Sequence, residues 1–118
     1  MRILHVEDDD DTRTLVACIL HGEGWQLVSV ENAKSAIKLA AAGGFDLYLI
    51  DNWIEGDTEN RLCRALRSLD PHTPILVYSG AVFPADVTSA LASGAQGYLK
   101  KPCTPEALVE EILKVSRR

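Results

Sequence analysis

The sequence predicts an α/β fold built around a parallel β-sheet, and three observations indicate this fold class. Short apolar runs alternate with longer segments of helical periodicity along the whole chain, which is the pattern of repeated βα units. The length of 118 residues suits one ordinary domain. A hydrophobic fraction of 47% and a charged fraction of 25% are typical of a globular protein with a single core. We therefore predict one domain over residues 1–118, with no output domain within the chain.

The first βα unit opens the chain. Residues 2–6 are predicted to form a strand, and a helix is predicted from about Asp11 to Gly22. Asp10 or Asp11 is a suitable N-cap, and the glycines at 22 and 24 end the helix. The apolar residues that we place on its inner face are Leu15, Cys18 and Ile19.

The second unit combines a strand over residues 25–30 with a helix that Asn32 caps and Gly43 and Gly44 end. The residues predicted to face inward from this helix are Ala33, Ala36, Ile37, Ala40 and Ala41.

The third strand, residues 47–50, is continuously apolar, as expected for a strand covered on both faces, and it ends at Asp51. A polar loop then leads to a helix near residues 59–69. We expect the core side of this helix to carry Leu62, Leu66 and Leu69. We expect the opposite side to carry three solvated arginines, Arg61, Arg64 and Arg67.

Two further units complete the pattern. They are predicted to comprise strand 75–78, a helix near 85–93, strand 97–100 and a last helix that runs to about Ser116. Ser79 and Gly80 end the fourth strand, while Lys101 and Pro102 end the fifth. Thr104 is a suitable N-cap for the last helix.

Composition argues against several functional classes. The net charge of −5 disfavours direct binding of nucleic acid, which needs a basic surface. The N-terminus lacks a signal peptide, and no apolar run is long enough to span a membrane. We therefore expect a cytoplasmic protein without membrane contact. The cysteines, Cys18, Cys63 and Cys103, lack the spacing of a zinc site, and we expect all three to be reduced and structural.

Residues with reactive side chains follow four of the predicted strands. Glu7 and Asp8 follow the first strand, Asp51 the third, Ser79 the fourth and Lys101 the fifth. In open parallel sheets, ligands bind beyond the carboxyl ends of the strands, where the winding direction reverses. Each residue alone has an ordinary structural explanation, but four strands that deliver matching groups to one rim indicate a functional site.

The chemistry that suits this rim is phosphoryl transfer to a carboxylate. Clustered carboxylates with few other ligands favour Mg²⁺, which keeps several of its waters. Asp51 is the candidate nucleophile, and Lys101 and the hydroxyl of Ser79 would neutralise charge on the transferred group.

On these residues the chain resembles the receiver domains of two-component response regulators, over essentially its whole length. The matching segments are Ile3-Leu4-His5-Val6-Glu7-Asp8, Leu49-Ile50-Asp51, Val77-Tyr78-Ser79-Gly80 and Gly97-Tyr98-Leu99-Lys100-Lys101-Pro102. The resemblance implies a flavodoxin-like (βα)5 fold with strand order 2-1-3-4-5 and helices on both faces. It also implies a phosphoacceptor signalling domain rather than an enzyme.

The family's site residues map onto positions of this chain. By resemblance, Glu7, Asp8, Asp51 and the backbone carbonyl of Trp53 would hold Mg²⁺. Lys101 is preferred over Lys100, because the family places its lysine directly before proline, often across a cis bond. Ser79 and Tyr98 would be the switch residues, and Tyr98 would turn inward as Ser79 moves toward the phosphoryl group.

The resemblance also implies partners. The phosphodonor would be a sensor histidine kinase or a histidine phosphotransfer protein, and the signal would leave through the fourth helix, fifth strand and fifth helix. The downstream effector is not identified by the sequence. We expect a monomer or a weak homodimer.

Three positions after the phosphoacceptor depart from the family's pattern. Glu55 and Glu59 stand where proline and glycine are usual, which makes this loop more acidic. By the resemblance, the bulky Trp53 would lie beside the phosphoryl group and face the small Ala81. Our hypothesis is that its indole shields the acyl phosphate from water and prolongs its lifetime.

Two alternatives remain at this point. A pseudo-receiver would keep the fold as an interaction module without accepting phosphate. A haloacid-dehalogenase-like enzyme fits poorly, because that family needs an aspartate two residues after the nucleophile and Trp53 stands there.

Overall fold

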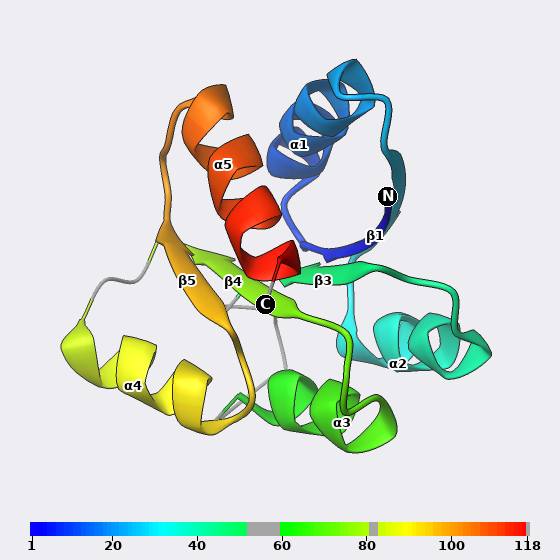
Figure 1. Cartoon of the computed structure of the whole chain (residues 1–118), viewed down its shortest axis with the longest axis vertical. Helices are drawn as coiled ribbons and strands as arrows, with labels where there is room; N and C mark the ends of the chain where they lie inside the picture. The colour runs from blue at the N-terminus through cyan, green and yellow to red at the C-terminus, as the bar shows by residue number, and fades with distance from the viewer. Residues whose placement is uncertain (52–59, 81–82, 118) are drawn as a thin grey trace.

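The computed structural model describes residues 1–51, 60–80 and 83–117. Strands and helices alternate strictly along this part of the chain (Figure 1). The strands are β1 (Arg2–Val6), β2 (Gln26–Val30), β3 (Leu47–Ile50), β4 (Ile75–Ser79) and β5 (Gly97–Lys100). The helices are α1 (Asp10–Gly22), α2 (Ala33–Ala42), α3 (Arg61–Leu69), α4 (Pro84–Ala92) and α5 (Pro105–Ser116). Each predicted element is present, with bounds that differ from the prediction by no more than two residues.

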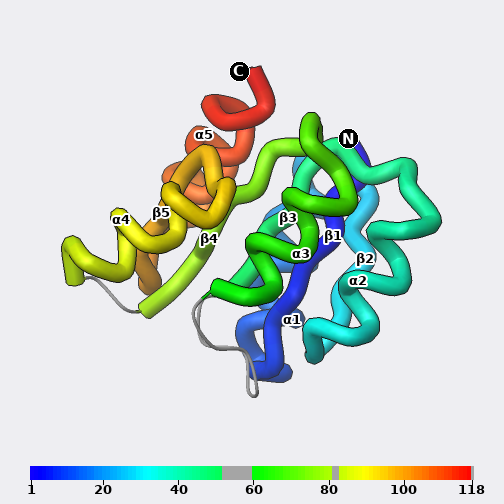
Figure 2. Tube along the Cα trace, turned by 90° about the horizontal axis from the view of Figure 1, so that it is seen from below, coloured from blue at the N-terminus to red at the C-terminus, as the bar shows by residue number. Residues whose placement is uncertain are grey.

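The five strands form one parallel sheet in the order β2-β1-β3-β4-β5. The implied strand order is therefore confirmed. The winding direction reverses between β1 and β3, which pair with Val6 opposite Ile50. Helices α1 and α5 cover one face of the sheet, while α2, α3 and α4 cover the other (Figures 1 and 2).

The core is divided by the sheet into two layers. One layer joins the inner sides of α2, α3 and α4 to side chains of β1, β3 and β4. The other joins α1 and α5 to the opposite side chains of the same strands. Because the central strands are buried on both faces, their sequences are apolar at nearly every position.

The N-caps follow the local sequence rules. Asn32 accepts a hydrogen bond from the Ser35 amide at 2.8 Å, and Thr104 accepts one from the Ala107 amide at 3.1 Å, as predicted. The cap of α1 is Asp9, which accepts from the Thr12 amide at 2.9 Å. The predicted caps, Asp10 and Asp11, lie inside the first turn instead, where acidic side chains interact favourably with the helix dipole.

The inner face of α1 was predicted incorrectly. Val16 and Leu20 are the buried residues, whereas Leu15 is 57% exposed, Cys18 is exposed and Ile19 is half-buried. Apolar residues occupy most positions from 15 to 20, so the 3.6-residue period alone does not select one stripe. Contact with β1 and α5 selects it.

Smaller errors of the same kind occur on α2 and α3. Ala36 and Ala40 are buried as predicted, but Ile37 and Ala41 are exposed. On α3, Leu62 and Leu66 are buried, Leu69 is 46% exposed and Cys63 takes the third core position. The wrongly predicted residues lie at the edges of the apolar face of each helix. There, a small rotation of the helix about its axis decides whether a side chain is buried or exposed.

Arg67 is not a solvated residue, contrary to the prediction. Its guanidinium donates to the Gly94 carbonyl at 2.9 and 3.2 Å, to the Asp70 carbonyl at 3.0 Å and to the Gln96 side-chain oxygen at 2.7 Å. It therefore ties the end of α3 to the turn between α4 and β5. Arg61 and Arg64 are exposed, as expected.

Two findings bear on the predicted cellular context. Cys18, Cys63 and Cys103, all among the described residues, form no disulfide, but the exposed position of Cys18 does not support a structural role in the core. In the part of the chain that the structure describes, no helix is both long enough and apolar enough to cross a membrane.

Candidate phosphoacceptor site

Parallel strands deliver the predicted rim residues to one edge of the sheet. Glu7 and Asp8 directly follow β1, and Asp51 directly follows β3, the neighbouring strand. The Asp51 amide donates to the Val6 carbonyl at 3.0 Å, which extends the β1–β3 pairing up to the carboxylates. The arrangement puts three acidic side chains at the point where the winding direction reverses, as predicted.

Glu7 is the most enclosed of these acids, with 1% of its surface exposed. Its amide donates to the Val30 carbonyl of β2 at 2.9 Å. The Arg13 guanidinium donates to the Glu7 carbonyl at 2.6 Å and also pairs with Asp10. The backbone amide and the backbone carbonyl of Glu7 are therefore both held, the first by β2 and the second by α1.

The carboxylates of Glu7, Asp8 and Asp51 form a compact cluster. Each offers an oxygen, and these oxygens lie within 4.8 Å of one another. Glu7 and Asp51 are buried while Asp8 is exposed, so the cluster is open to water on one side. A set of oxygen donors with an open side suits a hard divalent cation that retains waters, so these residues fit Mg²⁺.

Lys101 contributes the positive charge of the site. Its ammonium pairs with a carboxylate oxygen of Glu7 and lies 3.4 Å from Oδ2 of Asp51. The peptide bond between Lys101 and Pro102 is cis, as the resemblance implied. Lys100 is exposed at the end of β5. The preference for Lys101 over Lys100 as the site lysine stays a prediction.

The acids are electrostatically coupled. Burial raises the pKa of Glu7 to about 7, the neighbouring Asp51 acts in the same direction, and Lys101 opposes both. Three carboxylates and one ammonium thus share a small volume with an excess of negative charge. Such a site favours an added divalent cation that oxygen atoms bind. It also has a positive group, Lys101, next to Asp51.

The sequence profile of the response regulator receiver domain matches residues 3–113 of this chain. The chain belongs to this family. Receiver domains are signalling domains of two-component systems rather than conventional enzymes, which agrees with the prediction.

Curated relatives match this receiver domain over nearly all of its residues. The DNA-binding response regulator MtrA of Mycolicibacterium smegmatis (strain ATCC 700084 / mc(2)155) is 32% identical over 117 residues, which cover 99% of this chain and 51% of MtrA. The chain thus spans about half the length of the curated relatives it matches.

Two solved structures are similar in both sequence and fold. Chemotaxis protein CheY4 of Vibrio cholerae has a TM-score of 0.90 at 28% identity, with 97% of each chain covered. A response regulator protein from Burkholderia pseudomallei has a TM-score of 0.85 at 27% identity, with 96% of this chain and 71% of that chain covered. The latter structure contains a phosphorylated aspartic acid, a calcium ion and citrate.

The two expected switch residues lie on β4, the neighbour of β3, and on β5, the strand beyond it. Ser79, the last residue of β4, is fully buried, and its carbonyl accepts from the Lys101 amide at 2.8 Å. Tyr98 pairs with Val77 across β4 and β5, and its side chain is half-buried against the core layer of α2, α3 and α4. Ser79 is therefore tied to Lys101 through the backbone, whereas the switch roles stay predictions.

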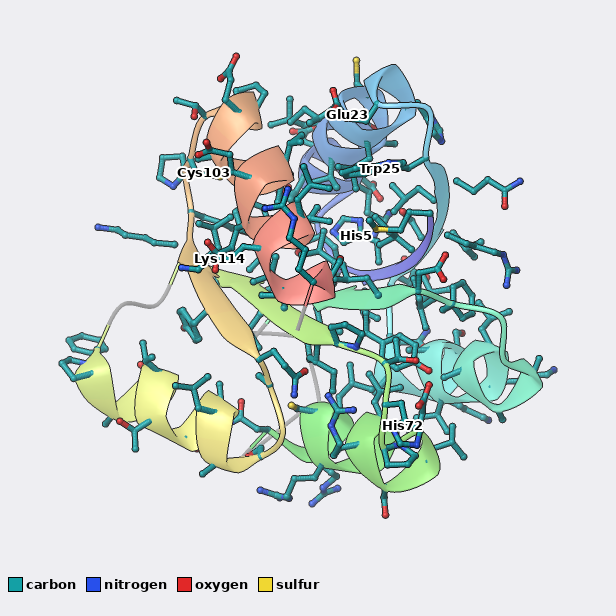
Figure 3. The ribbon with its side chains drawn as sticks, in the orientation of Figure 1. His5, Glu23, Trp25, His72, Cys103 and Lys114 are labelled. Atoms are coloured by element: carbon teal, nitrogen blue, oxygen red, sulfur yellow. The ribbon has the colours of Figure 1, made fainter. Side chains whose placement is uncertain are left out.

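His5 is a feature of the site that the sequence did not reveal. It lies on β1, two residues before Glu7, and its ring is buried on the side of α1 and α5 (Figure 3). Burial lowers its pKa to about 3, and Lys101 acts in the same direction, so the ring is neutral. Nδ1 lies 3.3 Å from the Ser29 hydroxyl. The available signal was the alternation of β1, which puts His5 on the same side as the buried Ile3.

Several residues named in the sequence lie outside the described residues. They are Trp53 with its backbone carbonyl, Glu55, Glu59 and Ala81. Trp53 as a metal ligand and as a shield of the acyl phosphate therefore stays a prediction.

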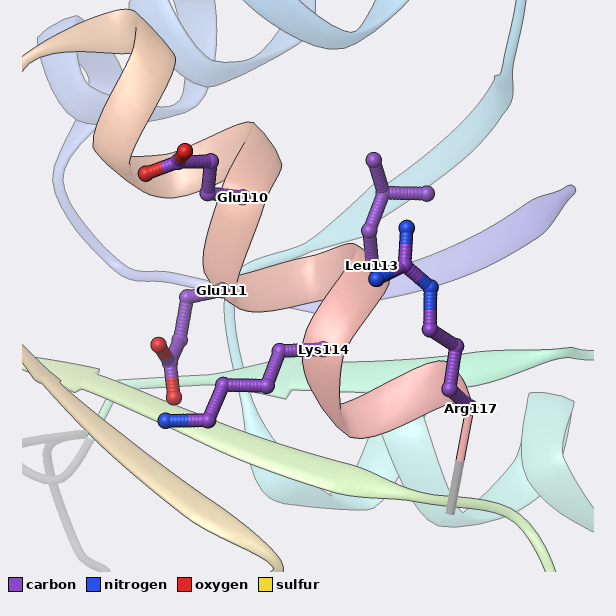
Figure 4. Close-up of a pocket in the computed structure, with 5 residues that line it drawn as sticks. All are labelled: Glu110, Glu111, Leu113, Lys114 and Arg117. Carbon is purple, nitrogen blue, oxygen red and sulfur yellow. The ribbon is translucent and has the colours of Figure 1, made fainter.

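A hollow elsewhere on the surface is lined by residues of the last helix and the residue after it. It is lined by Glu110, Glu111, Leu113, Lys114 and Arg117 (Figure 4). All five belong to α5 or directly follow it, and none follows a strand of the sheet.

Proposed function

We propose that this receiver domain accepts a phosphoryl group on Asp51 from a phosphohistidine of a sensor histidine kinase or a histidine phosphotransfer protein. The observation that carries the proposal is that Asp51 lies in one cluster with two further carboxylates and beside the ammonium of Lys101. A neutral rim or an isolated aspartate would lack the charges that phosphoryl transfer requires.

The proposed transfer needs no group beyond those of the donor and the site. A carboxylate oxygen of Asp51 attacks phosphorus, the bond between phosphorus and the donor's imidazole nitrogen breaks, and the electron pair stays on that nitrogen, which takes up a proton. Lys101 balances negative charge on the phosphoryl oxygens from its position beside Asp51. The Ser79 hydroxyl donates to one of these oxygens once it turns toward the rim.

Glu7, Asp8 and Asp51 would hold Mg²⁺, and the backbone carbonyl of Trp53 stays a predicted further ligand. When bound, the ion supplies positive charge that offsets repulsion between the carboxylates and the incoming phosphoryl group. Glu7 and Asp8 would still hold the ion with their carboxylates while that of Asp51 reacts.

The output of the domain would be a shift in the population of two states of the α4-β5-α5 face. Ser79 would move toward the phosphoryl group, and Tyr98 would follow inward from its half-buried position. The matched relative MtrA is named a DNA-binding response regulator. A DNA-binding effector is therefore one candidate for the output of this receiver domain. A cytoplasmic location stays a prediction.

The test is phosphorylation of the purified chain. Incubation with acetyl phosphate and Mg²⁺ should add one phosphoryl group by intact-mass measurement, and Asp51→Asn should abolish the addition without changing the far-ultraviolet circular dichroism spectrum. Labelling that persists in Asp51→Asn would refute the assignment. Absence of labelling in the unaltered chain, together with no NMR response to beryllofluoride and Mg²⁺, would indicate a pseudo-receiver instead.

A further inference from the structure

Tyr78 lies directly beneath the lysine of the proposed site. The Lys101 ammonium is 5.1 Å from the centre of the Tyr78 ring, within the range of a cation–π interaction. Tyr78 precedes Ser79 on β4, and the Lys101 amide donates to the Ser79 carbonyl. The aromatic ring and the ammonium therefore come from two adjacent strand ends that are hydrogen-bonded to each other.

The Tyr78 ring is held in place on its other sides. Only 7% of the residue is exposed, and its apolar part belongs to the core layer beneath α1 and α5. Its hydroxyl lies 3.8 Å from the thiol of Cys103, which is placed just before α5 (Figure 3). Burial raises the pKa of Tyr78 to about 12, and the contact with Cys103 acts in the same direction. The ring that faces Lys101 is thus a neutral phenol.

A flexible lysine at this site has two competing acidic partners. The ammonium pairs with Glu7, yet phosphoryl transfer to Asp51, 3.4 Å away, requires it to balance charge on the phosphoryl group instead. The four-carbon side chain of lysine has many rotamers, and ordering it has an entropic cost. A ring face beside the ammonium attracts the charge without forming a directional bond, so it restricts the lysine while allowing it to move between Glu7 and Asp51.

We infer that Tyr78 is a positioning residue for Lys101, which confines the ammonium to the space between Glu7 and Asp51. This role rests on the proposed phosphorylation of Asp51. Tyr78 would affect that reaction only through its contact with Lys101. Tyr78 itself does not contact the reacting carboxylate in this role. Its contribution is to reduce the conformational freedom of the lysine before the phosphodonor arrives.

The first measurement concerns position alone and needs no phosphorylation. In the unaltered chain, NMR should show upfield ring-current shifts of the Lys101 ε-methylene protons. Tyr78→Leu should remove these shifts, and Tyr78→Phe should keep them because the ring face is retained. Lys101 ε-methylene protons at the shifts of an exposed lysine in the unaltered chain would overturn the inference without any variant.

The second measurement concerns the reaction. Tyr78→Leu should slow phosphorylation by acetyl phosphate about three- to tenfold, as expected from loss of one partly buried cation–π contact, while Tyr78→Phe stays within about twofold of the unaltered chain. The matched control is Tyr48→Leu, which removes a buried strand tyrosine whose hydroxyl bonds Asp70 rather than lying beside Lys101. The control should lower the midpoint of thermal unfolding and leave the phosphorylation rate unchanged.

The outcomes separate this inference from the proposed function. If the unaltered chain is phosphorylated and Tyr78→Leu reacts at the same rate, or Tyr78→Phe reacts as slowly as Tyr78→Leu, the inference is wrong and the proposed function stands. If the unaltered chain is not phosphorylated, the proposed function fails, while the ring-current shifts still decide whether Tyr78 positions Lys101.

Discussion

Lys101 pairs with Glu7, the buried acid after β1, although its ammonium also lies 3.4 Å from Asp51. The ammonium of Lys101 thus links Glu7, after β1, to Asp51, after β3. Lys101 itself follows β5, the strand at one edge of the sheet. The pair matters for function, because Glu7 competes with Asp51 for the charge that phosphoryl transfer needs. It matters for stability as well, since without Lys101 two buried carboxylates would face each other.

Replacing Lys101 should affect phosphorylation much more than replacing its neighbour. Lys101→Met should slow phosphorylation by acetyl phosphate about 10²-fold or more, the usual effect of losing one fixed charge-stabilising group. Lys100→Met is the control, because Lys100 is exposed at the end of β5 and should react normally. Rates of phosphoprotein formation by intact-mass measurement give the comparison, and equal rates for the two variants would contradict the role of Lys101.

Removing one carboxylate of the cluster should weaken Mg²⁺ binding. Glu7→Gln and Asp8→Asn should each raise the dissociation constant by about tenfold or more, because each removes a charged ligand from a site with few of them. Asp11→Asn is a matched control, since Asp11 is an exposed acid in the same block but outside the cluster. Isothermal titration with MgCl₂ measures the constants. A loss of affinity in Asp11→Asn as large as in Glu7→Gln would mean that net charge, not the cluster, governs binding.

Asp70 should stabilise the fold in a defined range of pH. A hydrogen bond from the Thr73 hydroxyl, together with the His72 and Thr73 amides at 3.0 and 3.1 Å, lowers the pKa of Asp70 from 3.8 to about 2. A lowered pKa in the folded state means that the stabilisation is complete above pH 3.8 and is lost as the pH falls through about 2.

The consequence can be measured by urea unfolding between pH 5 and pH 2, a window set by this shift. Asp70→Asn should lower the free energy of unfolding at pH 5 by about 1 kcal/mol, a value reduced for the partial exposure of the side chain. The difference between the variant and the unaltered chain should shrink toward pH 2. A difference that is constant across this range would show that the carboxylate charge is not the cause.

Arg67 should contribute more to stability than the other arginines of α3. Arg67→Met should lower the free energy of unfolding by roughly 2–3 kcal/mol, because it leaves the carbonyls of Gly94 and Asp70 without their charged donor. Arg61→Met is the control, as Arg61 is exposed on the same helix, and it should change stability by less than about 0.5 kcal/mol. Chemical denaturation of both variants tests the difference, and equal effects would be inconsistent with the contacts of Arg67.

Much of the fold was predictable because its signals are local. The alternation of apolar runs and helical segments indicated the order of elements, and Asn32 and Thr104 marked helix starts through hydrogen bonds within one turn. The rim was predictable for a topological reason: parallel strands end at the same edge, so Asp8, Asp51 and Lys101 had to be near one another once the strands were recognised.

The errors have a common physical origin in contacts between distant segments. Leu15 was assigned to the core because periodicity gives a stripe but not its rotation, which packing against β1 and α5 decides. The sequence predicts a solvated Arg67 because the partners of its side chain, Gly94 and Gln96, come from a turn more than 25 residues away. The sequence did not reveal the contact of His5 with Ser29, because Ser29 approaches it only across the sheet.

The sequence by itself determined the α/β fold, the order of its elements and the residues that meet at the rim. These follow from periodicity, capping and the shared direction of the strands, all of which are encoded within short windows of the chain. Only the tertiary structure decided which acid Lys101 pairs with, and that the ring of Tyr78 lies beside its ammonium. Side-chain partners across strands depend on rotamers and burial, which exist only when the sheet and both helical layers are assembled.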